Sequence, residues 1–212
     1  MIKAVIWDFG GVITSSPFEA FNRLEEDRGL PRDFIRTINS KNPDTNAWAL
    51  FERAEISADA FDEAFAQEAD GKVRGAEVIK CLGGTVRPEM VEALRRIKAR
   101  FKTACITNNV QAGEGAGMVR DADTARQIAT IMDELFDHVI ESSKIGVRKP
   151  DPRIYQMACE AIAVEPGACI YLDDLGINLK PARAMGMQTI KVLNAAQALD
   201  ELEPLVGFSL RG

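Results

Sequence analysis

The sequence predicts an α/β fold: a Rossmann-like, doubly wound parallel sheet with an α-helical cap inserted after the first strand. Short apolar runs rich in β-branched residues alternate with amphipathic helical stretches, which is typical of a parallel sheet covered by helices on both faces. One long segment, residues 17–84, breaks this alternation and shows helical patterns only. A chain of 212 residues, 46% of them hydrophobic, is long enough for such a core and a small inserted domain.

The expected strands are too short for helices, and several lack the alternation of a half-exposed strand, which indicates burial on both faces. In chain order they are Ala4–Trp7, Thr103–Ile106, Val139–Ile140, Cys169–Leu172 and Thr189–Leu193. The helices expected between them carry an apolar stripe or a terminal signal such as a first-turn proline or a final glycine. They cover Pro88–Phe101, Ala122–Phe136, Asp151–Ala163 and Leu179–Met185.

The segment after the first strand is expected to form a separate helical cap. Its helical stretches are Phe18–Arg28, Ala47–Arg53 and Ala58–Glu68. Gly83 and Gly84 form a natural hinge where the chain rejoins the core. We therefore expect an α/β core of residues 1–16 and 85–212, with residues 17–84 as the cap.

Charge and composition exclude several classes of partner. With 26 basic and 32 acidic residues the net charge is −6, which argues against nucleic acid or an anionic membrane as the main partner. No apolar run approaches the ~20 residues of a membrane helix, and the N-terminal stretch lacks a secretory pattern, so we expect a cytoplasmic protein. The four cysteines are scattered, which favours reduced, buried thiols, and the single histidine, His138, argues against a multi-histidine metal site.

Polar residues follow the expected strands at the points where those strands end. Asp8 follows the first strand, Thr107-Asn108-Asn109 ends the second, and Asp173-Asp174 ends the fourth. Lys149 lies in the loop after the third. Ligands of open α/β sheets bind beyond the carboxyl ends of the strands, so these side chains are expected to form one site.

The chemistry of this set indicates a divalent ion and a phosphate group. Carboxylates brought together repel unless a cation lies among them, and an all-oxygen set selects a hard ion such as Mg²⁺, with Asp8 and Asp174 as ligands. The Thr107 hydroxyl, the Lys149 ammonium and neighbouring backbone N–H groups suit phosphate oxygens. Asp8 is then the candidate nucleophile, forming an aspartyl-phosphate that water hydrolyses. For the N–H groups we expect Gly10, Gly11 and Asn108.

Four stretches resemble the motifs of the haloacid dehalogenase (HAD) superfamily in their order along the chain. They are WDFGGVIT, ACITNN, ESSKIGVRKPDPRIY and IYLDDLGINLKPARAMGM. The last two are similar to the N-terminal phosphatase domain of soluble epoxide hydrolase and to the HAD domain of acyl-CoA dehydrogenase fusions. The resemblance covers nearly the whole core, whereas the insertion resembles the family's C1 cap only in placement and helicity.

The resemblance assigns a role to each residue of the site. Asp8 is implied to be the nucleophile and a Mg²⁺ ligand, and Asp174 the second side-chain ligand. Thr107 and Lys149 would hold the phosphoryl group. Asp173 would hold metal-bound water or orient the site.

Gly10 departs from the pattern of the family's phosphatases. They usually carry a second aspartate at this position, whose carbonyl ligates the metal and whose side chain protonates the leaving oxygen. Gly10 retains only the carbonyl, and loss of a general acid commonly costs about 10²–10⁴ in rate. We therefore expect a weakened phosphatase for a small phosphorylated metabolite, least impaired on sugar-1-phosphates, acyl phosphates or aryl phosphates.

Three alternatives stay open at the level of sequence. A haloacid dehalogenase also lacks this aspartate, although the Asp173-Asp174 pair argues against it. A phosphonatase-like hydrolase would need a cap lysine as a Schiff base. A catalytically impaired domain would bind a phosphorylated ligand or a protein partner.

Substrate-selecting residues are expected in the cap, which closes over the site. Trp48 and Arg53 are candidates, because an aromatic ring near a guanidinium suits a sugar or aryl group with a second anionic charge. Asn109 is expected to orient a ligand, and pairing of two copies through the cap is considered. The stretch Gly113–Gly117 resembles half of a dinucleotide fingerprint with the wrong spacing, which favours a surface loop.

Overall fold

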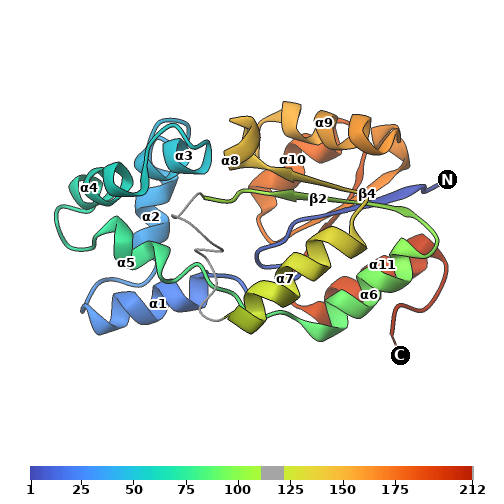
Figure 1. Ribbon diagram of the computed structural model, residues 1–212, viewed down its shortest axis with the longest axis horizontal. Coiled ribbons are helices and arrows are strands. Elements are labelled where there is room, and N and C mark those ends of the chain that lie inside the picture. The colour runs from blue at the N-terminus through green and yellow to red at the C-terminus, as the bar shows by residue number, and fades with distance from the viewer. Residues whose placement is uncertain (111–121, 212) are drawn as a thin grey trace.

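The computed structural model describes residues 1–110 and 122–211. At its centre lies a five-stranded sheet with the order β3-β2-β1-β4-β5, in which every neighbouring pair is parallel. The strands are β1 (Ala4–Trp7), β2 (Lys102–Thr107), β3 (His138–Glu141), β4 (Cys169–Asp173) and β5 (Gln188–Lys191). The predicted parallel α/β fold is therefore confirmed (Figure 1).

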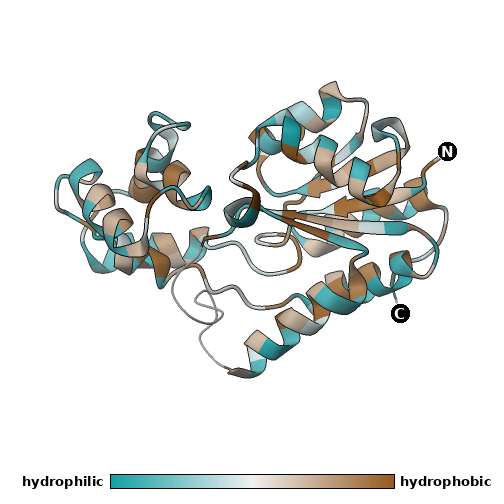
Figure 2. Ribbon diagram, turned by 45° about the horizontal axis from the view of Figure 1, so that its top comes forward, coloured by the Kyte–Doolittle hydropathy of each residue, from teal (hydrophilic) through white to brown (hydrophobic). Residues whose placement is uncertain are grey.

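Helices cover both faces of the sheet. One face carries α6 (Pro88–Lys98), α7 (Ala122–Leu135) and α11 (Ala195–Val206), and the other carries α9 (Pro152–Ile162) and α10 (Gly176–Ala184) (Figure 1). Along β1, Val5 and Trp7 pack into the first layer, whereas Ala4 and Ile6 pack into the second. Both faces of the strand are thus buried, which explains why its sequence is continuously apolar (Figure 2).

The element boundaries differ from the expectation mainly at the strand ends. Strands β2, β3 and β4 extend by one or two residues, and β5 ends at Lys191, which leaves Leu193 exposed beyond it. Helix α11 was not predicted, and it contains Pro204 near its end. Its start is set by Asn194, whose side chain accepts a hydrogen bond from the Gln197 N–H at 2.9 Å.

Residues 17–84 form helices throughout and contain no strand; all of them belong to the described part of the chain. The helices are α1 (Phe18–Asp27), α2 (Phe34–Ser40), α3 (Ala47–Glu52), α4 (Ala58–Glu68) and α5 (Gly75–Ile79). They lie together at one end of the molecule (left in Figure 1) and share an aromatic core in which the Phe51 and Phe61 rings stack at 4.5 Å. This segment therefore has a hydrophobic core of its own.

Two linkers join the helical segment to the core and pair with each other. Thr14 and Val86 form an antiparallel bridge, and the Ser15 N–H donates to the Thr85 carbonyl at 2.8 Å. A Cβ on Gly84 would lie 2.7 Å from the Ser15 carbonyl oxygen, so a glycine is needed for this approach. The predicted domain boundaries, 16/17 and 84/85, fall at these linkers and stay a prediction.

The remaining sequence features have simple places in the structure. The four cysteines, all of them described residues, are buried and form no disulfide, and His138 is an exposed residue at the start of β3. The glycine-rich stretch 113–117 lies outside the described residues. Within the described residues, no helix combines the length and the apolar character that crossing a bilayer requires.

Candidate active site

The polar residues at the strand ends meet at the centre of the sheet. Strand β1 lies between β2 and β4, with Trp7 in register with Cys105 and Leu172. Asp8 directly follows β1 and donates its N–H to the Leu172 carbonyl at 2.8 Å. After β3 the chain crosses to the opposite side of β1 to form β4. This reversal of strand order is the switch point at which α/β sheets bind ligands.

A buried lysine joins two of the acidic residues. Lys149 Nζ lies 2.7 Å from Asp8 Oδ1 and 2.8 Å from Asp173 Oδ2, and only 2% of the Lys149 side chain is exposed. Asn108 fixes the backbone of this lysine from both sides: its Oδ1 accepts the Lys149 N–H at 2.8 Å, and its Nδ2 donates to the Lys149 carbonyl at 3.1 Å. The end of β2 therefore sets the position of the ammonium group.

Asp173 is completely buried, and both of its carboxylate oxygens are engaged. Oδ2 accepts from the Tyr171 hydroxyl as well as from Lys149, and Oδ1 accepts the Leu175 N–H at 2.8 Å. The Asn178 amide donates to both oxygens at 3.1 Å. A carboxylate has about four acceptor positions, so these donors leave little capacity for another ligand.

Asp174 completes an acidic cluster with Asp8 and Asp173. Each of the three offers a carboxylate oxygen, and these atoms lie within 4.8 Å of one another. Asp174 packs directly over Gly11, where an added Cβ would lie 2.2 Å from Asp174 Oδ2. Gly11 also has a φ of +81°, a backbone conformation that side chains disfavour. Glycine at this position is therefore required by both space and conformation.

The charges of the cluster are unbalanced. Burial, more than any neighbouring charge, raises the pKa of Asp8 well above its ordinary value, and Asp173 and Asp174 raise it further against the opposing effect of Lys149. Burial and, next, the Asp173 carboxylate raise the pKa of Asp174 from 3.8 to about 6. Burial alone would lower the pKa of Lys149, but the carboxylates of Asp173 and Asp8 outweigh it and raise that pKa. One ammonium thus faces three carboxylates, which favours binding of a further cation.

The loop after Asp8 is compact, and there is free space beside Gly10. The Phe9 carbonyl accepts the N–H groups of Ile13 and Thr14 at 2.9 and 3.1 Å, and the Phe9 N–H donates to Asp8 Oδ1 at 2.6 Å. Within the described residues no backbone N–H donates to the Gly10 carbonyl. A Cβ on Gly10 would meet no atom within 4 Å, in contrast to Gly11.

The other predicted site residues lie in different surroundings. Thr107 is buried at the end of β2, beside β1. Asn109 joins β2 to the start of α8 (Ser142–Ile145): its Nδ2 donates to Glu141 at 2.9 Å, and its Oδ1 accepts from the Ser143 hydroxyl at 2.9 Å.

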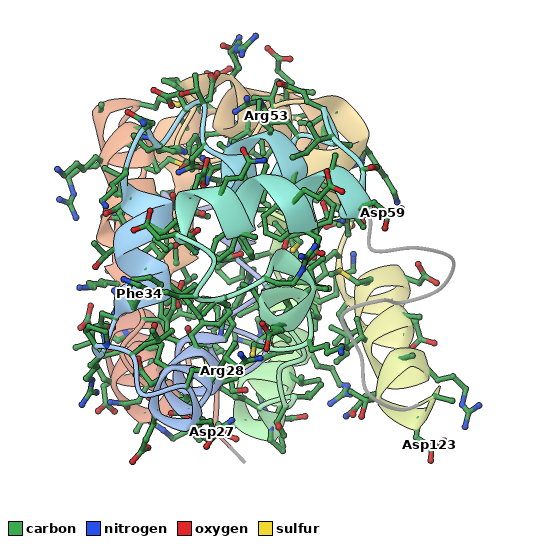
Figure 3. All side chains as sticks on the ribbon, turned by 90° about the vertical axis from the view of Figure 1, so that its left-hand side faces the viewer. Asp27, Arg28, Phe34, Arg53, Asp59 and Asp123 are labelled. Atoms are coloured by element: carbon green, nitrogen blue, oxygen red, sulfur yellow. The ribbon has the colours of Figure 1, made fainter. Side chains whose placement is uncertain are left out.

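Trp48 and Arg53 make their contacts within the helical segment 17–84, the predicted cap. The Trp48 ring packs edge-on against Phe61 at 5.6 Å. Arg53 pairs with Glu55 at 2.5 Å and donates to the Asp44 carbonyl at 3.1 Å. Figure 3 labels Arg53. The structure therefore gives neither side chain a contact with the acidic cluster.

An unpredicted ion pair joins the end of α3 to the loop that carries Lys149. Glu52, at the end of α3, is 6% exposed and accepts from Arg148 Nε at 2.6 Å and from Asn108 Nδ2 at 3.3 Å. Its main-chain carbonyl accepts from the Ser142 hydroxyl at 2.7 Å. No sequence pattern pairs residues so far apart, although the place of Arg148 directly before Lys149 is a hint. The cap thus contacts the loop that presents the buried lysine.

Comparisons with known proteins agree with this geometry. A family model described as haloacid dehalogenase-like hydrolase matches residues 2–186. Mouse acyl-CoA dehydrogenase family member 10 is 31% identical over 98% of the chain, and mouse bifunctional epoxide hydrolase 2 is 32% identical over 97%. The chain spans only 19% and 39%, respectively, of the lengths of these two relatives.

Two further matches are similar in length to the chain. Phosphatase MT3486 of Mycobacterium tuberculosis is 30% identical over 94% of the chain and 91% of its own length. The HAD family enzyme bt-2542 of Bacteroides thetaiotaomicron, solved with magnesium and inorganic phosphate, aligns with a TM-score of 0.62 over 95% of the chain and 99% of its own. At 15% identity, this structural similarity concerns the fold alone.

The family match covers most of the sequence, and the expected resemblance to the two mouse relatives is confirmed. The parallel sheet and the acidic cluster at its switch point fit the same group of enzymes. The chain therefore belongs to the haloacid dehalogenase-like hydrolases.

Proposed function

We propose that this hydrolase is a Mg²⁺-dependent phosphatase that acts on a small phosphate monoester, with Asp8 as the nucleophile. The observation that carries the proposal is the Asp8 carboxylate, held 2.7 Å from a buried ammonium and grouped with Asp174 at the switch point of the sheet. A relative described as a phosphatase and a similar fold solved with magnesium and phosphate support it.

The residues present fit a hard divalent cation. The cluster offers only oxygen ligands, and its three carboxylates outnumber the Lys149 ammonium, which contacts Asp8 and Asp173. Asp8, Asp174 and the Gly10 carbonyl would hold the ion, since Asp173 is already engaged by four donor groups. When bound, Mg²⁺ would neutralise excess negative charge and polarise the phosphoryl oxygens.

Each side chain at the site then has its own role in the proposed reaction. Asp8 Oδ1 already accepts from Lys149 and from the Phe9 N–H, so Oδ2 is the oxygen free to attack phosphorus. The new bond joins Oδ2 to phosphorus as the bond to the leaving oxygen breaks. Lys149 and the Thr107 hydroxyl would hold the phosphoryl oxygens, with the Gly11 and Asn108 N–H groups as further donors. Water then attacks phosphorus and releases Asp8 and inorganic phosphate.

Asp173 acts on this reaction through Lys149. It is completely buried and binds the ammonium at 2.8 Å, while Tyr171 and Asn178 fix its own orientation. We assign it as a positioning residue that keeps Lys149 aimed at the phosphoryl group. Gly10 supplies no proton to the leaving oxygen, so the enzyme favours leaving groups that depart without one.

Hydrolysis of p-nitrophenyl phosphate tests the proposal. We expect turnover with Mg²⁺, loss of turnover when a chelator is added, and no turnover by Asp8→Asn. If the wild-type protein with Mg²⁺ is no faster than Asp8→Asn, the domain binds a phosphorylated ligand without catalysis.

The same preparation separates the other hydrolase classes. Halide release from a 2-haloacid that is unaffected by chelator would indicate a dehalogenase. A phosphonatase needs a cap lysine at the site, and the cap lysines Lys41, Lys72 and Lys80 are all exposed. Trapping of a lysine adduct by borohydride reduction in the presence of phosphonoacetaldehyde would reverse this conclusion.

A further inference from the structure

A cavity adjoins the acidic cluster. It has a volume of about 330 Å³, and its wall includes both Gly11 and Asp174 from the site described above. The remaining wall comes from the start of α1, from α2, from the returning linker, from the start of α10 and from the end of β5. Residues of both the cap and the core therefore line it, next to the position proposed for the metal.

The lining of this cavity is basic although the chain as a whole is acidic. Arg36, Arg87 and Lys191 line it, against a single carboxylate, Asp174, whereas the whole protein carries a net charge of −6. A cleft lined by one sign of charge concentrates ions of the opposite sign. Anionic groups are thus favoured at this position.

The cations of the cavity are only partly satisfied by the protein. Within the described residues, Arg87 Nη1 is buried without a hydrogen-bond partner. Arg36 lies over the Phe18 ring at 4.2 Å and pairs with Asp33 at 3.1 Å, where both side chains are well exposed. Buried donors that lack an acceptor are uncommon in native proteins, and an anion in the cavity would supply one.

The start of α10 adds to this field. Leu175 and Gly176 line the cavity, and α10, a helix of nine residues, begins at Gly176. The N-terminal N–H groups of a helix favour negative charge in their neighbourhood. Backbone and side chains therefore point to the same class of ligand.

We propose that this basic cavity is a second anion subsite, and that the preferred substrate is a phosphate monoester carrying a second acidic group, a carboxylate or another phosphate. The proposal rests on the function proposed above and specifies its substrate class. One acidic group would bind at Asp8 while the other lies among Arg36, Arg87 and Lys191. Because Arg36 belongs to the cap and Lys191 to the core, such a substrate would hold the two together. Binding energy from this remote group can offset a weak proton donor at the reacting oxygen.

A matched pair of substrates tests the subsite. The ring esters 3-carboxyphenyl phosphate and 3-carbamoylphenyl phosphate have nearly the same shape and differ in charge. We expect wild-type kcat/KM to be at least about tenfold higher for the carboxylate. In Arg87→Met and Lys191→Met this ratio falls toward one. Arg95→Met, which removes an exposed cation of α6 outside the cavity, keeps the wild-type ratio.

Equal wild-type rates on the two esters, or wild-type ratios in both cavity variants, overturn the subsite. Lys191 is exposed, so its variant keeps the test valid if Arg87→Met fails to fold. The bisphosphate of 1,3-dihydroxybenzene, compared with 3-carbamoylphenyl phosphate in the same proteins, tests a second phosphate in place of the carboxylate.

A binding measurement tests the proposed anion subsite independently of turnover. In the Asp8→Asn background, titration calorimetry with 3-carboxyphenyl phosphate should show about tenfold weaker binding after Arg87→Met or Lys191→Met. Unchanged binding in both variants contradicts the subsite. If p-nitrophenyl phosphate is not hydrolysed but this binding is lost as expected, the proposed catalysis fails and the subsite stands.

Discussion

Replacing Gly10 by aspartate should restore the proton donor that the site lacks. The position accepts a side chain, because a Cβ built on Gly10 meets no atom within 4 Å and the backbone there is not in the left-handed region. The loop that carries it is held by hydrogen bonds to the Phe9 carbonyl, which the substitution leaves in place. We therefore expect Gly10→Asp to fold with wild-type stability.

The size of the effect follows from the chemistry of the leaving group. A positioned general acid contributes about 10²–10⁴ in rate, which corresponds to ~3–5 kcal/mol of transition-state stabilisation. An alkoxide needs this proton, whereas p-nitrophenolate leaves without it. Gly10→Asp should thus raise kcat/KM on an alkyl phosphate such as glycerol 2-phosphate by about 10² or more, and on p-nitrophenyl phosphate by much less.

The assay compares both substrates at saturating Mg²⁺ for the wild type, Gly10→Asp and Gly10→Asn. The asparagine variant matches the aspartate in shape but cannot donate a carboxyl proton, so it should resemble the wild type. Equal acceleration of both substrates, or equal effects of aspartate and asparagine, would refute the account of this glycine.

Three further outcomes follow from the packing and charge of the site. Gly11→Ala should weaken Mg²⁺ binding at least about tenfold in calorimetry, because its Cβ would lie 2.2 Å from Asp174 Oδ2. The control Gly10→Ala should leave Mg²⁺ binding unchanged, and similar Mg²⁺ affinities of the two variants would contradict this placement of Asp174. Glu52→Gln should lower the free energy of unfolding in urea by ~1.5–3 kcal/mol, because a buried acceptor for Arg148 loses its charge; an unchanged midpoint would show that this contact does not secure the cap. In the metal-free protein, stability should fall as the pH rises from about 4 to about 6, since the unfolded chain releases the Asp174 proton at 3.8 and the folded chain at about 6. The share of Asp174 in this loss is of the order of 3 kcal/mol, and Asp174→Asn should remove that share while the contribution of Asp8, whose pKa is also raised, remains; parallel pH profiles for the two proteins would contradict the raised pKa of Asp174.

The sequence predicted the strand ends well because each bears a local signal. Asp8, Thr107 and Asp173 each follow or end an apolar run, and the parallel order of the strands brings them to one edge. Lys149 was found through the motif around it, and its ion pairs at 2.7 and 2.8 Å agree with the expected convergence.

Local sequence patterns did not predict the contacts between segments that are far apart in the sequence. Glu52 and Arg148 lie 96 residues apart in sequence, and no local pattern pairs them. For Trp48 the residue type is consistent with two uses, ligand binding and packing: its ring packs against Phe21 and Phe61, and a contact with substrate stays a prediction. Burial within a small helical core competes with ligand binding for the same residue type.

Detection of a phosphoenzyme tests the central claim most directly. Protein mixed with Mg²⁺ and p-nitrophenyl phosphate would be quenched in acid, digested and mapped by mass spectrometry. We predict one phosphoryl group on the peptide that contains Asp8, labile to base and absent from Asp8→Asn. Turnover in the same sample with the phosphoryl group on another residue, or with Asp8→Asn fully active, would contradict the claim that Asp8 attacks phosphorus.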